Sequence, residues 1–516
     1  MYPYAYAHAQ HEKKVQQTIS IIPNSVIYMI VNTVKQSLEE ADYPITVIGF
    51  TEETINNPPK PLEKTINQII KLGDFKAEKE STATLYTTEM KTPRILLVGL
   101  GKTSELDLET LRKTSGTISR KIRDKNTKAG IDLESFQHNN LTQEKTAEAL
   151  TQSIIMGSYN PKYYKTKKLE KIKQLEEITL FHPKLNKTTE KHIETGKIIG
   201  EAVNYCRKLA WGPGNIITPT MLAEEAEKIG AKYKIKTTIY DREQAKQIGL
   251  HSFLAVAQGT EEPPKFITME YGTEHPETIA LIGKGITFDT GGISLKSRDG
   301  MPSMKTDMTG GAIVLAALEA AARLDLKLHI IGIIPATDNM PDGKAYHPGD
   351  VIQSYSGQTI EVVSTDAEGR MIINDALSYA ADKYKPKAMF DFATLTGSIH
   401  VAVGDHAIGY FSNQDWVAEK IENASGDSGE KVWRMPLWDE YAEQLESDVA
   451  DFKHTGGRPG GAVTAAKFLE KFVMDTPWAH LDIAGHAEQK KDHGYNPKGS
   501  KGPAVRLVVQ MLRNWK

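Results

Sequence analysis

Three short segments of the chain carry carboxylates and lysines that could act together. Residues 281–296 read LIGKGITFDTGGISLK, residues 304–311 read MKTDMTGG and residues 364–370 read STDAEGR. The side chains in them that could do chemistry are Lys284, Asp289, Lys296, Asp307, Asp366, Glu368 and Arg370. Carboxylates held close together repel one another and raise each other's pKa unless a cation neutralises them. The combination therefore indicates a site for divalent cations.

A pair of ions would explain why so many charged groups are needed. Two divalent ions about 3.5–4 Å apart, bridged by carboxylates, lower the pKa of a shared water and supply hydroxide near neutral pH. Beside two cations, Lys284 would be driven toward its neutral form and could donate a nitrogen lone pair. Lys296 and Arg370 would keep their charge and could hold an oxyanion or an anionic partner.

Several of these residues also have a purely structural interpretation. Asp307 lies just ahead of an expected helix and could cap its N-terminus. Asp366 and Glu368 could be turn residues that open the helix after them. If the chain instead stays extended beyond the apolar run 360–363, then Asp366, Glu368 and Arg370 would share one face. The residue types alone leave these interpretations open.

The segments that must position these residues alternate between strand and helix patterns. Apolar runs predict strands at residues 278–282, 328–334, 388–393, 406–411 and 479–483. Helical patterns lie between them at residues 310–324, 372–384 and 462–474. This alternation predicts a mixed sheet flanked by helices. Ligands of such sheets bind beyond the carboxyl ends of the strands.

The front of the chain predicts a separate α/β domain. Strand patterns at residues 44–50 and 94–99 alternate with helical patterns at residues 111–124 and 146–157. A continuous helix is expected over residues 187–209, before a cluster of Gly and Pro. We therefore predict two α/β domains: a smaller N-terminal domain (1–185), a linking helix (186–211) and a C-terminal catalytic domain (212–516) with a mixed central β-sheet flanked by helices.

Composition narrows the class of protein. The 516 residues are 40% hydrophobic and 25% charged with a net charge of −3, which gives no electrostatic basis for a dedicated nucleic-acid binder. The single cysteine, Cys206, excludes an intrachain disulfide framework and a multi-thiolate metal site, and favours a reducing compartment. The start, MYPYAYAHAQHEKK, lacks the features of a secretory signal, and no apolar stretch reaches the roughly 20 residues of a membrane span. A cytoplasmic protein without membrane association is expected.

At STDAEGR the sequence resembles the leucyl aminopeptidase (cytosol aminopeptidase) family of dinuclear metallopeptidases, whose signature usually reads NTDAEGR. Further similar segments follow the same order along the chain: SFLAVAQGTEEPPKFI, LIGKGITFDTGGISLK, NMPDGKAYHPGDVIQSYSGQTIEV, DFATLTGS, GEKVWRMPL, GGRPGGAVTAAKFL and WAHLDIAG. The likeness covers roughly residues 200–512 and extends more faintly to ILLVGLGK at 95–102. So many collinear segments make the resemblance specific.

The resemblance implies a metal-dependent aminopeptidase that removes the N-terminal residue of peptides, with Leu and other apolar residues favoured. It implies two divalent ions, Zn²⁺ or Mn²⁺, held by Lys284, Asp289, Asp307, Asp366 and Glu368, with help from the main-chain carbonyl of Asp366. It gives Lys296 the role of polarising the scissile carbonyl, and it places at Arg370 a bicarbonate ion that shuttles the proton of the attacking water. It also implies a homohexamer built from two trimers.

By the same resemblance, the pocket for the first side chain of the substrate would be lined by Met304, Thr394, Gly397 and Ala484. The main-chain carbonyl of Leu395 would contact the substrate amine. Two positions depart from the family pattern, because Ser364 and His454 stand where Asn is usual. The first leaves the preference for the second substrate residue open, and His454 is assigned no role.

Two other functions are alternatives. A different two-metal hydrolase, such as a phosphoesterase, could use the same carboxylates, but its ligands would normally be His and carboxylates rather than Lys284. A regulator or DNA-binding scaffold could keep only the fold. The complete set of active-site residues argues against it, and 29 Lys and Arg against 24 Asp and Glu in the first 200 residues is only weak support for DNA binding.

Overall fold

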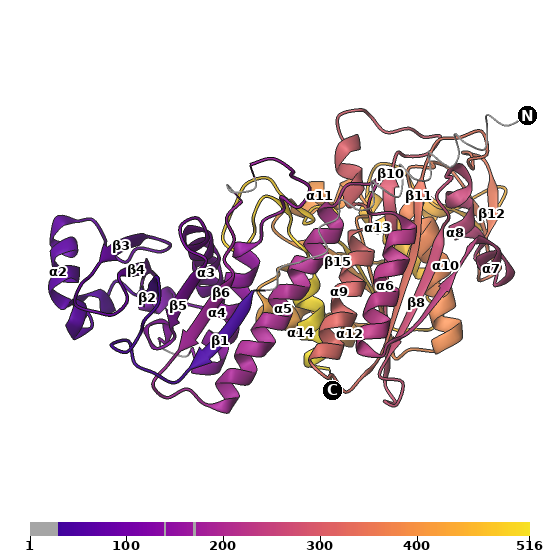
Figure 1. The fold of residues 1–516 in the computed structure, drawn as a ribbon. Coiled ribbons are helices and arrows are strands. Elements are labelled where there is room, and N and C mark those ends of the chain that lie inside the picture. Colours follow the sequence, from indigo (N-terminus) through magenta and orange to yellow (C-terminus); the bar gives the residue numbers. More distant parts are fainter. Residues whose placement is uncertain (1–28, 139–140, 169–171, 516) are drawn as a thin grey trace, which may run out of the picture. The chain divides into compact units, whose positions relative to one another are not determined.

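The structure is a computed structural model, and it describes residues 29–138, 141–168 and 172–515. The chain forms two compact units (Figure 1). Among the described residues, unit 1 comprises those of 29–201 together with 491–497, and unit 2 comprises 202–490 and 498–515. The first 14 residues, which the sequence predicts not to be a secretory signal, lie outside the described residues. Within the described residues, no helix combines the length and the apolar character needed to cross a membrane.

Unit 1 is an α/β unit, as predicted. Its sheet has the strand order β1 (Ile30–Val34), β6 (Glu177–Phe181), β5 (Lys128–Asp132), β2 (Thr46–Phe50), β4 (Arg94–Gly99) and β3 (Thr82–Tyr86). All neighbours in this sheet are parallel except β3, which runs antiparallel to β4. Its longer helices are α2 (Glu63–Leu72), α3 (Leu108–Arg123) and α4 (Gln143–Ser158). The α3 and α4 helices confirm the two helical predictions.

The short segment Lys491–Pro497 belongs to unit 1, although it is distant in sequence from the rest of that unit. In Lys491–Pro497, the Tyr495 hydroxyl donates a hydrogen bond to Glu109 Oε1 (2.8 Å), and Arg120 Nη1 donates to the carbonyl of Gly494 (2.5 Å). Both partners lie on α3. No local pattern in the sequence predicts this long-range contact.

Unit 2 contains the mixed sheet. Its strand order is β16 (Val432–Arg434), β15 (Ile408–Ser412), β18 (Trp478–Asp482), β14 (Ala388–Ala393), β9 (Thr278–Gly283), β11 (His329–Asn339), β8 (Lys265–Tyr271) and β7 (Lys236–Tyr240). Strands β18, β14, β9 and β11 are parallel, and β10 (Gly285–Asp289) pairs in parallel with the end of β11. Strands β15, β8 and β7 pair antiparallel with their neighbours β18, β11 and β8. The five strands predicted for this part of the chain are therefore confirmed.

Four of the helices in unit 2 match the helical patterns predicted at residues 187–209, 310–324, 372–384 and 462–474, and the others were not predicted (Figure 1). The helices of this unit are α5 (Lys187–Trp211, which begins in unit 1), α6 (Pro219–Tyr233), α7 (Arg242–Gln247), α8 (His251–Val256), α9 (Thr309–Arg323), α10 (Glu368–Tyr384), α11 (Gly397–Val403), α12 (Asp415–Ser428), α13 (Gly461–Glu470) and α14 (Val505–Arg513). A small sheet of β12 (Val351–Gln353), β13 (Thr359–Glu361) and β17 (Phe452–Lys453) accompanies the main one.

Helices α9 and α10 cover opposite faces of the central strands. A Cβ added to Gly332 of β11 would lie 2.4 Å from Leu318 of α9. Its neighbours Ile331 and Ile333 point the other way, because side chains alternate along a strand, and they share a core cluster with Met371 of α10. The loops at the start of both helices are thereby held at the same edge of the sheet.

The close approach of α9 to the strands gives a stability prediction. A Cβ on Gly310 would lie 2.0 Å from the carbonyl oxygen of Phe392 and 2.7 Å from the main-chain nitrogen of Lys284. Gly310→Ala should therefore force α9 outward and destabilise unit 2 by about 1–3 kcal/mol. Thermal unfolding should show a Tm several degrees below that of the unchanged protein.

The matched control is a helical glycine with free space around it. A Cβ on Gly426 of α12 meets no atom within 4 Å. Since Ala is favoured over Gly inside a helix by about 0.5–1 kcal/mol, Gly426→Ala should leave the Tm unchanged or raise it. Equal Tm values for the two variants would contradict the packing described for α9.

Candidate active site

The predicted site residues lie beyond the carboxyl ends of the parallel strands. Lys284 directly follows β9, and Asp289 is the last residue of β10. Thr394 follows β14, and Ala484 lies two residues beyond β18. These ends meet at one edge of the sheet, which is where open α/β sheets bind their ligands.

One cavity of about 660 Å³ collects almost all of these residues. It is lined by Lys284, Asp289, Lys296, Met304, Asp307, Asp366, Glu368, Thr394, Leu395, Gly397 and Ala484, together with eleven further residues. Arg370 is the one predicted site residue that does not line it, and its side chain is buried in the first turn of α10. The fold thus brings residues from distant parts of the sequence to one place.

Lys284 is the buried cation at the centre of the carboxylates. Its Nζ lies 2.7 Å from Asp307 Oδ2 and 2.7 Å from Glu368 Oε1, and it donates a hydrogen bond to the carbonyl of Thr394 (3.0 Å). Burial lowers the pKa of its ammonium group, but the surrounding carboxylates outweigh burial and hold the pKa above its usual value. A metal cation at these carboxylates would compete with the proton on the Lys284 ammonium group.

A second group of carboxylates opens toward the cavity. Asp289, Asp366 and Glu368 each offer an oxygen atom within 4.8 Å of the others. The ammonium group of Lys296 lies 2.7 Å from Asp289 Oδ2 and also forms a hydrogen bond with Asp366 Oδ1. Lys296 is therefore positioned at the mouth of the carboxylate cluster, where it can reach a bound molecule.

The electrostatics of the cluster fit a divalent cation. Burial raises the pKa of the Asp289 carboxyl, and the charge of Glu368 raises it further. Burial likewise raises the pKa of Asp307 well above its usual value, although Lys284 counteracts part of this effect. Buried oxygen ligands that repel one another are stabilised by a hard cation. The donor set of carboxylates and one amine is therefore suited to metal ions.

Two sequence-based interpretations are wrong. The chain does not remain extended through residues 366–370, because the N–H of Ala367 donates to the carbonyl of Ser364 (3.1 Å) and α10 begins at Glu368. Glu368 and Arg370 are thus in the first turn of a helix, where intrahelical hydrogen bonding replaces the extended backbone. Asp307 does not cap α9 either, since its Oδ1 accepts a hydrogen bond from Thr394 Oγ1 (2.5 Å).

Two further residues shape the site without having been predicted. The side-chain amide of Asn339 donates to Asp289 Oδ1 (2.8 Å) and to the carbonyl of Thr365 (3.0 Å), so it fixes two of the carboxylate-bearing segments together. A Cβ on Gly369 would lie 2.7 Å from Lys284 Cε. The glycine at position 369 leaves room for the buried lysine, because any side chain there would overlap the side chain of Lys284.

Arg370 is a buried cation with unused hydrogen-bonding capacity. Its Nη1 donates to the carbonyl of His454 (2.9 Å), while its Nε has no hydrogen-bond partner among the residues described. Burial lowers the pKa of the guanidinium group to about 10, so it remains charged near neutral pH. An unpaired donor on a buried cation suits a small anion.

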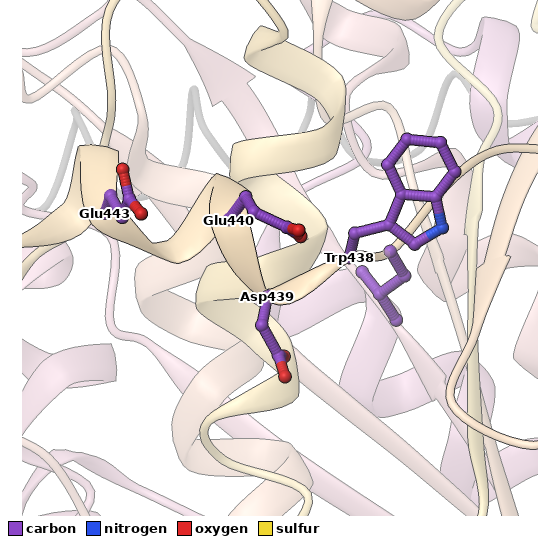
Figure 2. A pocket seen from close by; sticks show the side chains of 5 residues that line it. Trp438, Asp439, Glu440 and Glu443 are labelled. Carbon is purple, nitrogen blue, oxygen red and sulfur yellow. The ribbon is translucent and has the colours of Figure 1, made fainter.

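A second hollow lies elsewhere on unit 2 (Figure 2). It has a volume of about 850 Å³ and is lined by Leu437, Trp438, Asp439, Glu440 and Glu443. The carboxylates come from the 3₁₀ helix Asp439–Leu445, and the indole of Trp438 is 66% exposed. None of the predicted site residues lines this hollow.

Comparison with protein families gives two matches along the chain. Residues 204–509 match the catalytic domain of the cytosol aminopeptidase family, and residues 47–168 match the N-terminal domain of the same family. A probable cytosol aminopeptidase of Geotalea uraniireducens is 42% identical over 480 residues, which is 91% of this chain and 95% of that protein. One from Chlorobium luteolum is 41% identical over 501 residues, or 93% and 98% of the two chains.

Solved structures agree with these matches. A variant of tomato leucine aminopeptidase superimposes with a TM-score of 0.84 at 30% identity, covering 94% of this chain and 97% of its own. The bottromycin maturation enzyme BotP in complex with Mn superimposes with a TM-score of 0.83 at 29% identity, covering 91% of this chain and 99% of the BotP chain. The similarity therefore extends over both units.

Proposed function

Because the chain belongs to the cytosol aminopeptidase family and is a metal-dependent aminopeptidase, we propose that it releases the N-terminal residue of peptides at the cavity of unit 2 with two divalent ions. The observation that carries this proposal is the buried Lys284, 2.7 Å from both Asp307 and Glu368, beside the open cluster of Asp289 and Asp366. The two ions would be Zn²⁺ or Mn²⁺, and Mn is the metal in the complex of the structural relative BotP.

The residues that would hold the ions are Lys284, Asp289, Asp307, Asp366 and Glu368. When bound, such ions lower the pKa of a shared water and polarise a substrate carbonyl. For Lys284 to bind a metal, its ammonium must lose a proton. Metal binding should therefore strengthen as the pH rises.

Lys296 would stabilise the charge that develops on the substrate. Its ammonium group is held at the edge of the cluster by Asp289 and Asp366 and lines the same cavity. Burial lowers its pKa, but the carboxylates outweigh burial and keep the pKa above its usual value, so the group stays charged. A fixed cation in a partly dry cavity can donate to the carbonyl oxygen as that oxygen gains negative charge.

Arg370 would hold a bicarbonate ion whose role is to carry the proton of the attacking water. The unpaired Nε on a buried guanidinium supports this assignment. The rest of the cavity would bind the substrate. Met304, Thr394, Gly397 and Ala484 would contact the first side chain, preferably Leu or another apolar one, and the carbonyl of Leu395 would accept from the free amine.

Assembly and location are part of the same proposal. We propose a homohexamer arranged as a dimer of trimers, located in the cytoplasm, as the family resemblance implies. Sedimentation at equilibrium should give six times the mass of the chain. A mass of one or two chains at micromolar concentration would contradict it.

Metal removal is the experiment that tests the proposed function. Incubation with a strong chelator should abolish hydrolysis of a fluorogenic leucine amide, and Mn²⁺ or Zn²⁺ should restore it. Since ions bound only to the folded state stabilise it, reloading should also raise the Tm. A phosphate monoester assayed in parallel should not be cleaved, and rapid cleavage of it by the reloaded protein would favour a phosphoesterase instead.

A further inference from the structure

His454 is a fully buried histidine that lies directly behind the turn that carries Asp366. It follows β17, which pairs in parallel with β13, and its main-chain N–H donates to the carbonyl of Glu361 (3.1 Å). Its ring packs edge-on against Phe468, with ring centroids 6.4 Å apart. The imidazole is thus held in one orientation beside the segment that leads from β13 to Asp366.

Both ring nitrogens of His454 contact the main chain of that segment. The N–H of Val363 donates to Nδ1 (3.1 Å), and Nε2 lies 2.8 Å from the carbonyl oxygen of Ser364. Nδ1 also lies 3.2 Å from the carbonyl oxygen of Glu361. The proton is assigned to Nε2, because this tautomer donates at the shorter distance to Ser364 and keeps Nδ1 as the acceptor for Val363, whereas a proton on Nδ1 would satisfy only Glu361. The other tautomer would set the Nε2 lone pair against the Ser364 oxygen and would leave the Val363 N–H without its acceptor.

The same residue also holds Arg370. Its carbonyl accepts the hydrogen bond from Arg370 Nη1 (2.9 Å). Burial is the main cause that lowers the pKa of the imidazole to about 4, and the charge of Arg370 adds to it, so the ring is neutral near pH 7. One buried residue therefore contacts both the turn that carries Asp366 and the cation proposed to hold bicarbonate.

We propose that His454 is a positioning residue of the active site, and that its Nε2–H fixes the carbonyl of Ser364 and thereby the turn that presents Asp366 and Glu368. This inference rests on the proposed function of those carboxylates. The Ser364 carbonyl also accepts from the N–H of Ala367, so it is the point at which the turn closes into α10. Loss of the Nε2 donor would leave that carbonyl with one hydrogen bond fewer inside the protein and would loosen the turn.

The two departures from the usual family sequence meet at this hydrogen bond. Ser364 and His454 each stand where Asn is usual, and they are in direct contact although they are 90 residues apart. The side chain of Ser364 is shorter than Asn and its hydroxyl accepts from the N–H of Asp366 (3.4 Å). In this chain the imidazole of His454 supplies a further hydrogen bond to the turn, at the carbonyl of Ser364.

Two substitutions of His454 test the contributions of its two ring nitrogens separately. In His454→Gln the amide nitrogen reaches the position of Nε2 and can still donate to Ser364. In His454→Asn the amide is one bond shorter, so it can replace only the acceptor at Nδ1. The inference predicts that the Gln variant retains most of kcat, whereas the Asn variant loses about 10–100-fold in kcat with a nearly unchanged KM. The Asn variant should also bind Mn²⁺ about 10-fold more weakly by calorimetry of the metal-free protein.

The control for loss of a buried imidazole is His182→Asn in unit 1, where Nδ1 of a 4% exposed histidine accepts from the N–H of Lys184 (2.9 Å). This variant should keep both kcat and the Mn²⁺ affinity. The Tm of each metal-free variant shows whether it is folded, and equal Tm values for the Gln and Asn variants with different Mn²⁺ affinities would separate positioning from stability.

Equal kcat and equal Mn²⁺ affinity for His454→Asn and the unchanged protein would overturn the inference. So would a Gln variant as impaired as the Asn variant, because the Nε2 donor would then be irrelevant. If the unchanged protein neither binds Mn²⁺ nor cleaves a leucine amide, the proposed function itself fails, and the inference falls with it.

Discussion

Asp366→Ala is expected to lower kcat/KM for a leucine amide by at least about 10³-fold, because it removes a proposed oxygen ligand from the open carboxylate cluster. An oxygen of Asp366 and oxygens of Asp289 and Glu368 lie within 4.8 Å of one another, so a cation among them depends on all three. Calorimetric titration of the metal-free protein with Mn²⁺ should show that the variant binds fewer ions or binds them far more weakly.

The control is a carboxylate of the same region that does not line the cavity. Asp299 is exposed, in the loop that follows Lys296. Asp299→Ala should change neither turnover nor Mn²⁺ binding. A fully active Asp366→Ala enzyme with unaltered metal binding would show that Asp366 is not a ligand.

Lys296→Ala should lose about 10²–10³-fold in kcat while it still binds metal. The ammonium group of Lys296 neutralises Asp289 and Asp366 in the structure. Its removal leaves these carboxylates more strongly repelled from each other, so Mn²⁺ should bind at least as tightly as in the unchanged protein. The separation of metal binding from turnover distinguishes Lys296 from the proposed ligands.

Arg298→Ala is the matched control, since Arg298 is an exposed cation two residues away. It should keep full activity. A Lys296→Ala variant that turns over normally would show that another group stabilises the substrate charge, and one that loses its metal would assign Lys296 to structural support of the cluster.

The parts of the fold that depend on local patterns were predictable. The apolar run at residues 388–393 forms β14 (Ala388–Ala393), and the helical pattern at residues 187–209 forms α5 (Lys187–Trp211). The location of the site was predictable for a related reason. Parallel strands place their carboxyl ends at one edge, so ligand binding was expected beyond these ends, where Lys284 follows β9 and Thr394 follows β14.

What the sequence left open depends on contacts between distant segments. The turn at Ser364 was ambiguous because a local pattern cannot decide between extended chain and helix start, and the hydrogen bond from His454 comes from 90 residues away. Asn339 is 50 residues from Asp289, and although it opens one of the segments that resemble the family, nothing in the sequence indicated that it contacts Asp289. The role of His454 is recognised only when the pairing of β17 with β13 brings it behind the turn.

The most direct test of the proposed aminopeptidase activity is a comparison of two substrates that differ only at the amine. The metal-loaded protein is incubated with a leucine-initiated peptide and with the same peptide acetylated at its N-terminus, and free leucine is measured. We expect release of leucine from the first peptide, dependent on Mn²⁺ or Zn²⁺, and none from the second. No release from either peptide with any divalent metal, or equal cleavage of both, would contradict the proposed activity.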